Sequence, residues 1–331
     1  MKKIFCLFLL LIINCYAQEK LSELKGPYLG QKPPGDAPEL FAPNIVSSVY
    51  LEHSSAVFTP NGNEVFWSRE INIGRRPRII VVMHMKQENG VWSQPELSPF
   101  NFHDAAYNHI NSISPDGKRL YYFSSYDEMD SKIFMVDKTK NGWGEPRLFK
   151  QDINELHETK SGNLYCTGSC ESIPHGSGIV RSKLVNGEYQ AYESLGPHVN
   201  FSFDDPYPNH SPTVDPDERF VIFVSRRPGG FGPQDLYISY RQPDDTFGPA
   251  INLGEKINTI GRSNSWPQLS PDGKYLFFVG YTQIYSKEDL VGKKHSYEEL
   301  MDIQESIKNG LGNIYWVNTS FIEELKQTQL K

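Results

Sequence analysis

A short polar turn recurs along this chain at intervals of roughly 45 to 55 residues. In these turns Pro presets the backbone φ, Asp or Asn bonds back to the main chain, and Gly adopts positive φ. The third copy has lost Pro and Asp. The copies lie at 59–62 (TPNG), 114–117 (SPDG), 160–162 (KSG), 215–218 (DPDE) and 270–273 (SPDG).

Each turn stands between runs of residues that favour β-strands. In the unit 207–254 a first run, His210 to Val214, precedes the turn, and the aromatic and β-branched run Phe220 to Ser225 follows it. A third run, Leu236 to Tyr240, and a short fourth run complete the unit. Four strands per period predict an all-β fold, a β-propeller of four-stranded blades. The units span about 50–100, 105–150, 153–196, 207–254 and 262–318, which gives five blades by repeat count.

The segment 18–45 is too short for a blade and is rich in Gly and Pro. Its fragment 27–30 (PYLG) resembles the Leu253-Gly254 end of a fourth strand, and the last unit lacks a fourth strand of its own. We therefore expect the N-terminal segment to supply that strand and close the ring, because an open ring leaves strand edges unpaired. Residues 18–331 would then form a single propeller domain.

An insertion at about 287–311 interrupts the last unit. Ser296 and Glu299 have the spacing of a helix capping box, and Leu300, Ile303 and Ile307 follow at helical spacing. A short helix is predicted here. Packing against a blade edge is the expected arrangement, and a mobile lid is the alternative.

Residues 1–17 have the pattern of a signal peptide: a basic start, an apolar run and a small-residue cleavage site. The apolar run is too short for a transmembrane span. Acylation of Cys15, as in a lipoprotein, is the alternative. We expect a periplasmic or secreted monomer. A formal net charge of −7 argues against a nucleic-acid partner.

Two cysteines, Cys166 and Cys170, remain in the processed chain. In an oxidising compartment they are expected to form a local disulfide. The alternative is a metal site, which needs more ligands than the nearby His175 supplies. No cofactor and no metal are expected.

The first strand of each blade should line the central channel, and counting back from the end of each turn aligns these strands. The ninth position back holds His53, Asn108, Ile153, Asn209 and Asn264, and the eighth holds Ser54, His109, Asn154, His210 and Ser265. These two layers would surround the channel mouth with polar groups. They are predicted to bind a small polar ligand or glycan, or else to cap strands and bind water. A metal held by the imidazoles is the third alternative.

Other candidate groups are weaker. Arg226 follows a second strand and could bind an acidic sugar, or carbonyl groups of its own blade. Trp67, Trp92, Trp143 and Trp316 recur at equivalent positions and are expected in the core between blades. No pair of carboxylates has a defined spacing, so hydrolysis of glycosides by two carboxylates is not supported. No catalytic residues can be assigned.

The SPDG turns at 114–117 and 270–273, and the run Ser225 to Gly230 followed by Asp235-Leu236-Tyr237, resemble the TolB-like (WD-repeat-like) propellers of bacterial envelopes. The opening 28–35 (YLGQKPPG) resembles the start of a secreted Bacteroidetes-type subgroup. This resemblance implies six blades as an alternative to five. The repeat and the absence of a recognisable catalytic set favour a non-catalytic module that binds or scaffolds envelope proteins or glycans. The alternative is a carbohydrate-active, lyase-like enzyme that uses the His-rich channel mouth.

Overall fold

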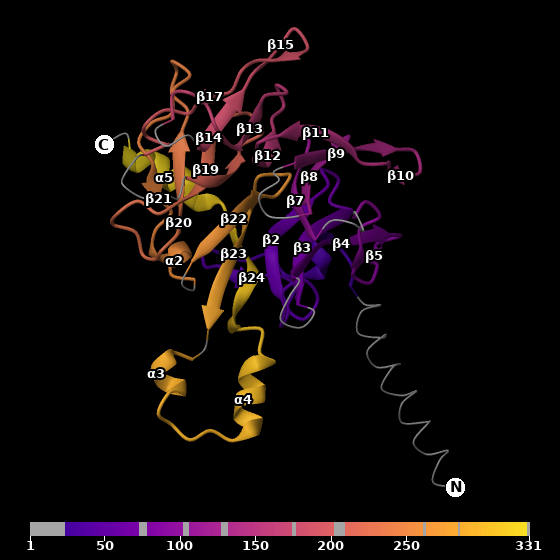
Figure 1. The fold of residues 1–331 in the computed structure, drawn as a ribbon, viewed down its shortest axis with the longest axis vertical. Coiled ribbons are helices and arrows are strands. Elements are labelled where there is room, and N and C mark those ends of the chain that lie inside the picture. Colours follow the sequence, from indigo (N-terminus) through magenta and orange to yellow (C-terminus); the bar gives the residue numbers. More distant parts are fainter. Residues whose placement is uncertain are drawn as a thin grey trace.

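A computed structural model describes residues 24–72, 78–101, 106–126, 132–173, 177–201, 209–260, 263–283 and 285–329. The predicted signal peptide and Cys15 lie outside these residues. The described chain is mostly β, as predicted, and its strands pair mainly antiparallel, in three four-stranded sheets, one ten-stranded sheet and one two-stranded hairpin (Figure 1). No helix in the described ranges is long and apolar enough to cross a membrane.

The first two sheets are joined by one parallel bridge, between Ile80 and Tyr107. The first sheet contains β2 (Leu51–Phe58), β3 (Glu64–Asn72), β4 (Arg78–Glu88) and the short β5 (Val91–Trp92) and β6 (Glu96–Leu97). The second contains β7 (Tyr107–Ile113), β8 (Arg119–Ser125), β9 (Lys132–Thr139), β10 (Gly142–Trp143) and β11 (Arg147–Gln151).

The remaining three sheets follow the same order along the chain. The third contains β12 (Asn154–Glu158), β13 (Leu164–Gly168), β14 (Gly178–Ser182) and β17 (Glu193–Ser194), with the hairpin β15 (Leu184–Val185) and β16 (Glu188–Tyr189) beside it. The fourth contains β18 (His210–Val214), β19 (Phe220–Ser225), β20 (Asp235–Tyr240) and β21 (Ile251–Asn252). The last contains β22 (Asn264–Leu269), β23 (Tyr275–Gln283), β24 (Asn309–Asn318) and β1 (Glu39–Leu40).

The first strands of the sheets contact one another in sequence. Strand β2 contacts β7, β7 contacts β12, β12 contacts β18, and β18 contacts β22. Strand β22 in turn contacts β2. This arrangement is propeller-like, and it places one strand of every sheet beside a shared central space.

Aromatic and branched side chains fill the layers between sheets. Trp67, Trp92 and Trp316 are buried, as predicted for core positions, whereas Trp143 is half-buried. The Trp143 indole N–H donates to the Glu64 carboxylate, 2.9 Å away. Because successive side chains of a strand point to opposite faces of its sheet, each sheet contributes side chains to the layers on both of its sides.

The N-terminal segment lies along the last sheet. Glu39 and Leu40 in β1 pair antiparallel with Trp316 and Tyr315 in β24. The fragment that resembled a strand end, Pro27–Gly30, is instead the 3-10 helix η1, so that part of the sequence interpretation is wrong. A proline at its first position favours a helical turn over a strand, because proline cannot donate to a sheet ladder.

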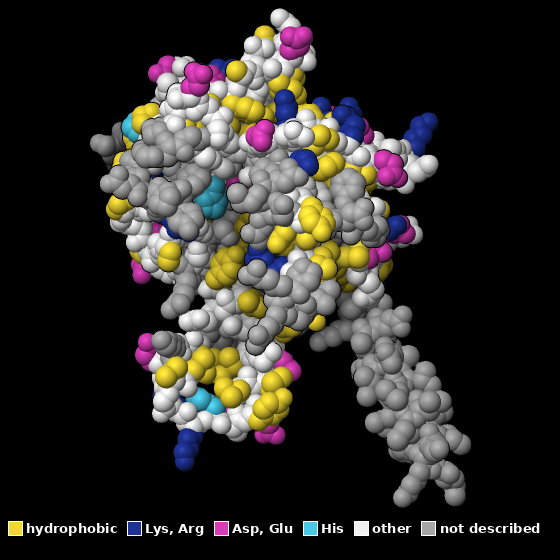
Figure 2. Space-filling view, in the orientation of Figure 1, with side chains coloured by type: hydrophobic (Ala, Val, Ile, Leu, Met, Phe, Trp, Pro, Cys, Tyr) yellow, Lys and Arg dark blue, Asp and Glu magenta, His cyan; other side chains and the backbone are white. Residues whose placement is uncertain are grey.

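The insertion in the last unit contains α3 (Lys287–Leu290) and α4 (Tyr297–Gln304). The capping box forms as predicted: Ser296 Oγ accepts from the Glu299 N–H, and the Glu299 carboxylate accepts from the Ser296 N–H. The expected packing on a blade edge is wrong. Helix α4 has no buried residue, and the insertion projects away from the sheets (Figure 1). Hydrophobic side chains gather on this projection (Figure 2).

Two further helices had no sequence prediction. They are α2 (Glu255–Asn258) and α5 (Ser320–Gln329). Helix α5 places Ile322 in the core formed by the fourth and last sheets. Its sequence lies outside the repeat, so repeat counting could not find it.

Cys166 and Cys170 are free cysteines in this structure, and their disulfide remains a prediction for the exported protein. Cys166, on β13, packs in a core cluster with Ile153 and Leu156, whereas Cys170 is half-buried in a loop and lies 3.3 Å from Ser172 Oγ. Cys170 packs against the same core cluster from its loop.

Candidate functional site: a cavity at the centre of the sheets

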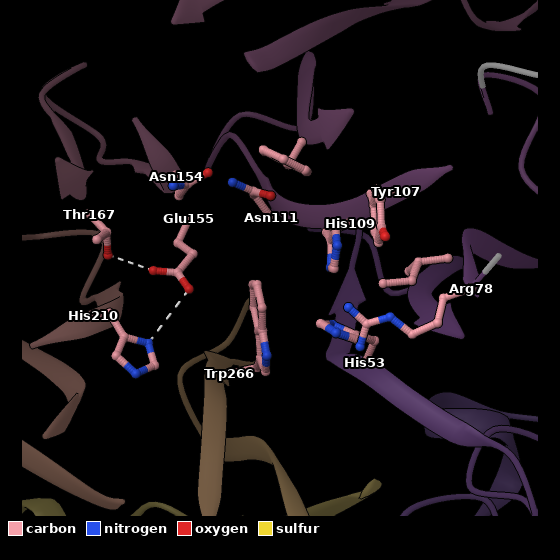
Figure 3. Close-up of a pocket in the computed structure, with 12 residues that line it drawn as sticks. His53, Arg78, Tyr107, His109, Asn111, Asn154, Glu155, Thr167, His210 and Trp266 are labelled. Carbon is pink, nitrogen blue, oxygen red and sulfur yellow. Dashed lines mark hydrogen bonds and ion pairs between the residues drawn. The ribbon is translucent and has the colours of Figure 1, made fainter. Parts of the chain in front are cut away.

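A cavity of about 420 Å³ lies where the first strands meet. Every one of the five first strands contributes at least one side chain to its wall (Figure 3). The lining residues are His53, Arg78, Ile80, Tyr107, His109, Asn111, Phe123, Asn154, Glu155, Thr167, His210 and Trp266. The cavity therefore brings together residues that are far apart in the sequence.

Bulges in the first strands control which side chains reach this space. Glu155, Ser211 and Trp266 occupy the same position in three successive strands, and all three have positive φ, at 56°, 49° and 51°. The pairing register shifts at each of these points. A bulge re-aims a side chain, and a left-handed non-glycine residue costs about 1–3 kcal/mol. The surrounding structure therefore holds these three residues in a strained conformation beside the cavity.

One side of the cavity is aromatic and contains two histidines. The His109 ring is stacked against Trp266 at 5.7 Å between centroids. His53 meets His109 edge to face at 4.4 Å. Burial lowers the pKa of His53 to about 4, with Arg78 adding to the effect, and burial also holds the pKa of His109 well below its ordinary value. Both rings are neutral at pH 7, and each can donate or accept a hydrogen bond.

The other side of the cavity contains a carboxylate. Glu155 Oε2 accepts from Thr167 Oγ1 at 2.5 Å and from the Ser211 N–H at 2.6 Å, and Oε1 accepts from Ser211 Oγ at 2.7 Å. His210 Nδ1 lies 3.7 Å from Oε1. Burial by itself would raise the pKa of Glu155, but these hydrogen bonds and the imidazole outweigh it and hold the pKa at about 2. Glu155 is ionised at neutral pH.

Figure 3 shows Trp266 between these two sides. His210 and Glu155 lie to one side of the indole, and His109, His53 and Arg78 lie to the other. Arg78 is partly exposed and pairs with Glu70 at 3.6 Å. A ligand that lies along the indole would thus meet a carboxylate at one end and nitrogen donors at the other.

Four residues of the two predicted layers line the cavity: His53, His109, Asn154 and His210. The predicted site residues Asn108, Asn209 and Asn264 do not. Each of these asparagines donates its side-chain amide to a backbone carbonyl instead. Asn108 Nδ2 donates to the Ile80 carbonyl at 3.3 Å, and Asn209 Nδ2 donates to the Phe201 carbonyl at 3.3 Å. Asn264 Nδ2 donates to the Ile257 carbonyl at 3.1 Å. Adjacent residues on a strand point to opposite faces, so two successive layers could not both face the channel.

His53 reaches the cavity from the same layer as these asparagines because the register of β2 shifts on both sides of Ser54. Arg226, the remaining predicted residue, is not among the lining residues and is half-buried elsewhere. Its neighbour Arg227 donates to the His198 and Val199 carbonyls, which fits a loop-bracing role for this arginine pair.

Glu155 and Trp266 were missed as site residues. Both stand at the seventh position before the end of the turn, one residue beyond the two layers that the sequence interpretation considered. A third layer of the same alignment would have included them. No sequence signal was available for Arg78 and Thr167, which lie on a third and a second strand.

Metal binding finds no support in this arrangement. Within the described ranges, no three His, Cys, Asp or Glu side chains are grouped closely enough to hold an ion. Glu155 is the one carboxylate among the described residues that line the cavity. The two-carboxylate arrangement of glycoside hydrolysis is therefore not present in the described wall.

No protein-family model matches this sequence, and no curated protein matches it. Solved structures similar to it include TolB from Acinetobacter baumannii (18% identity, TM-score 0.44, covering 68% of this chain and 48% of that one). They also include an α-L-arabinofuranosidase from Lactobacillus brevis (10% identity, TM-score 0.47, covering 82% of this chain and 92% of that one). A third is the periplasmic gluconolactonase PpgL from Pseudomonas aeruginosa (14% identity, TM-score 0.39, covering 73% of this chain and 68% of that one). This chain thus spans about half the length of TolB.

Proposed function

We propose that this protein is a binding protein for a small polar, sugar-like molecule, which it holds in the central cavity. The observation that carries the proposal is a set of buried polar atoms without protein partners beside an aromatic face. His53 Nδ1, His109 Nδ1 and both amide atoms of Asn111 have no hydrogen-bond partner among the described residues. Buried polar groups are nearly always paired, so these atoms require a ligand or water.

The wall suits a sugar ring. Trp266 offers an apolar face, and the unpaired atoms around it offer both donors and acceptors to hydroxyl groups. A cavity of about 420 Å³ is within the range of small-molecule sites. In the lyase-like alternative, the imidazoles of His109 and His210 in the same wall would act as the base.

We further infer five blades and a ring closed by the N-terminal segment. The inference rests on the contact of β22 with β2 and on the pairing of β1 with β24. The signal-type pattern of residues 1–17 supports export to the periplasm or beyond, where glycans and envelope proteins are available as ligands.

A panel of monosaccharides, titrated calorimetrically into the chain without residues 1–17, tests the proposal. We expect at least one sugar to bind, and Trp266→Leu to weaken its binding about tenfold or more. Trp143→Leu is the matched control, because Trp143 lies outside the cavity, and it should leave binding unchanged. Equal losses in both variants, or no binding by any sugar, would contradict the proposal.

A further inference from the structure

Among the described residues, the carboxylate of Glu155 has hydroxyl, backbone N–H and imidazole neighbours but no lysine or arginine partner. Its interactions with described residues are those with Thr167, Ser211 and His210. Thr167 donates through its hydroxyl group, and Ser211 donates through both its backbone N–H and its hydroxyl group. A carboxylate offers about four acceptor positions, and these bonds occupy three of them. The fourth position, on Oε1, faces His210 Nδ1 at 3.7 Å, which is longer than a hydrogen bond, so a further donor can take it.

His210 contacts Ser211 more closely than it contacts the Glu155 carboxylate. Ser211 Oγ donates its single proton to Glu155, so the 2.9 Å contact between that oxygen and His210 Nδ1 requires Nδ1 to carry a hydrogen. On the far side of the ring, the Gln234 amide nitrogen lies 3.5 Å from Nε2. Gln234 Oε1 accepts from Ser263 Oγ at 3.1 Å.

The negative charge is also partly open to the cavity. The side chain of Glu155 is 12% exposed, and that of His210 is 24% exposed. The other charged residue in the wall, Arg78, lies beyond Trp266 and pairs with Glu70 (Figure 3). A buried carboxylate in a cavity attracts a cation strongly because the local dielectric constant is low.

We propose that the Glu155 side of the cavity is a subsite for a protonated primary amine, and that the ligand is an amino sugar. An ammonium group brings three donors, one of which fits the open position on Glu155 Oε1. The Trp266 indole beside it adds a face that attracts both a cation and a sugar ring. This inference rests on the proposed sugar-binding function and names the chemical class of the ligand.

The test compares probes that differ at one group. The probes are glucosamine, N-acetylglucosamine and glucose, which share a ring and differ at C2. A higher affinity for glucosamine than for the other two therefore measures the contribution of the charged amine. We expect glucosamine to bind about tenfold to a hundredfold more tightly than glucose at pH 7, because a charge-assisted hydrogen bond is gained. Glu155→Gln should abolish that preference. Glu324→Gln, at an exposed position on α5, is the matched control.

A second pair of probes separates this inference from the proposed function. Cyclohexylamine and cyclohexanol contain the amine or the hydroxyl without a sugar. If no sugar binds but cyclohexylamine binds in a manner that depends on Glu155, the amine subsite stands and the sugar-binding function fails. Equal affinities for glucosamine and glucose would overturn the subsite and leave the sugar-binding function standing. A preference for the amine that survives Glu155→Gln, in protein with an unchanged thermal midpoint, would also overturn it.

Discussion

The imidazole rings of His53 and His109 meet edge to face in the wall of the cavity, 4.4 Å apart between centroids. The two residues come from neighbouring sheets, on β2 and β7. Two charged imidazoles could not share this place, because each would be desolvated and would repel the other. The wall therefore depends on both rings remaining neutral.

The first prediction concerns pH. Burial lowers the pKa of both histidines in the folded protein, so the unfolded chain binds more protons below the ordinary pKa of about 6.5. The free energy of unfolding should therefore fall as pH drops from about 6.5 toward 4. His109→Gln should reduce the slope in this window by about 1.4 kcal/mol per pH unit. Urea unfolding of both proteins from pH 7 to pH 4 measures it, and parallel curves would contradict the argument.

Much of the fold was accessible from the sequence because its turns are local. A turn such as 215–218 needs only its own residues to form, and the strands on either side were predicted with almost their observed bounds. The order of strands within a blade follows from short hairpin connections. By contrast, Pro27–Gly30 was assigned to a strand although it forms a 3-10 helix, because four residues contain too little pattern to separate the two.

The second prediction concerns the N-terminal segment. Phe41 directly follows β1, is fully buried, and packs against Trp316 and Phe277 of the last sheet. Phe41→Ala should lower the free energy of unfolding by about 3–5 kcal/mol, as for other buried phenylalanines. Deleting 18–45 should cost at least as much, because it also exposes the edge of β24.

Phe231→Ala is the control for this change, because Phe231 is 52% exposed. It should alter stability by less than about 1 kcal/mol. Similar losses for Phe41→Ala and Phe231→Ala in chemical denaturation would remove the reason for assigning the segment a role in closing the ring.

The site was harder to predict than the fold because bulges change which side chains face the axis. The simple count placed Asn108 and His109 in the channel together, yet the strand directs Asn108 into the blade and His109 into the cavity. Glu155 and Trp266 reach the cavity through backbone with positive φ. An L-residue rarely adopts positive φ. Tertiary contacts stabilise this conformation, and they cannot be predicted from the sequence of one strand.

The third prediction concerns the two cysteines. Burial raises the pKa of the Cys166 thiol, whereas Cys170 is half-buried in a loop. A maleimide should therefore modify Cys170 in the folded, processed protein and reach Cys166 only on unfolding, because the thiolate is the reactive form. Mass spectrometry of native and denatured samples distinguishes one adduct from two. A protein that accepts none under denaturing, non-reducing conditions would instead contain the disulfide predicted from the sequence.

The last prediction separates residues that cap strands from residues that face the cavity. Asn108 is buried, donates to the Ile80 carbonyl and accepts from Ser124 Oγ at 2.8 Å. Asn108→Ala should lower the free energy of unfolding by about 1–3 kcal/mol, because it leaves buried polar groups unpaired. It should not change the affinity for a sugar that binds the wild-type protein.

The double variant His109→Asn with His210→Asn should abolish sugar binding and change stability little. The two imidazoles lie on opposite sides of Trp266, so both ends of a bound ring would lose a contact (Figure 3). Calorimetry should find no binding of that sugar, while the thermal midpoint stays within about 5 °C of the wild type, since a loss near 1 kcal/mol moves it by only a few degrees. Unchanged affinity in the folded double variant would show that these imidazoles only complete the wall and do not hold the ligand.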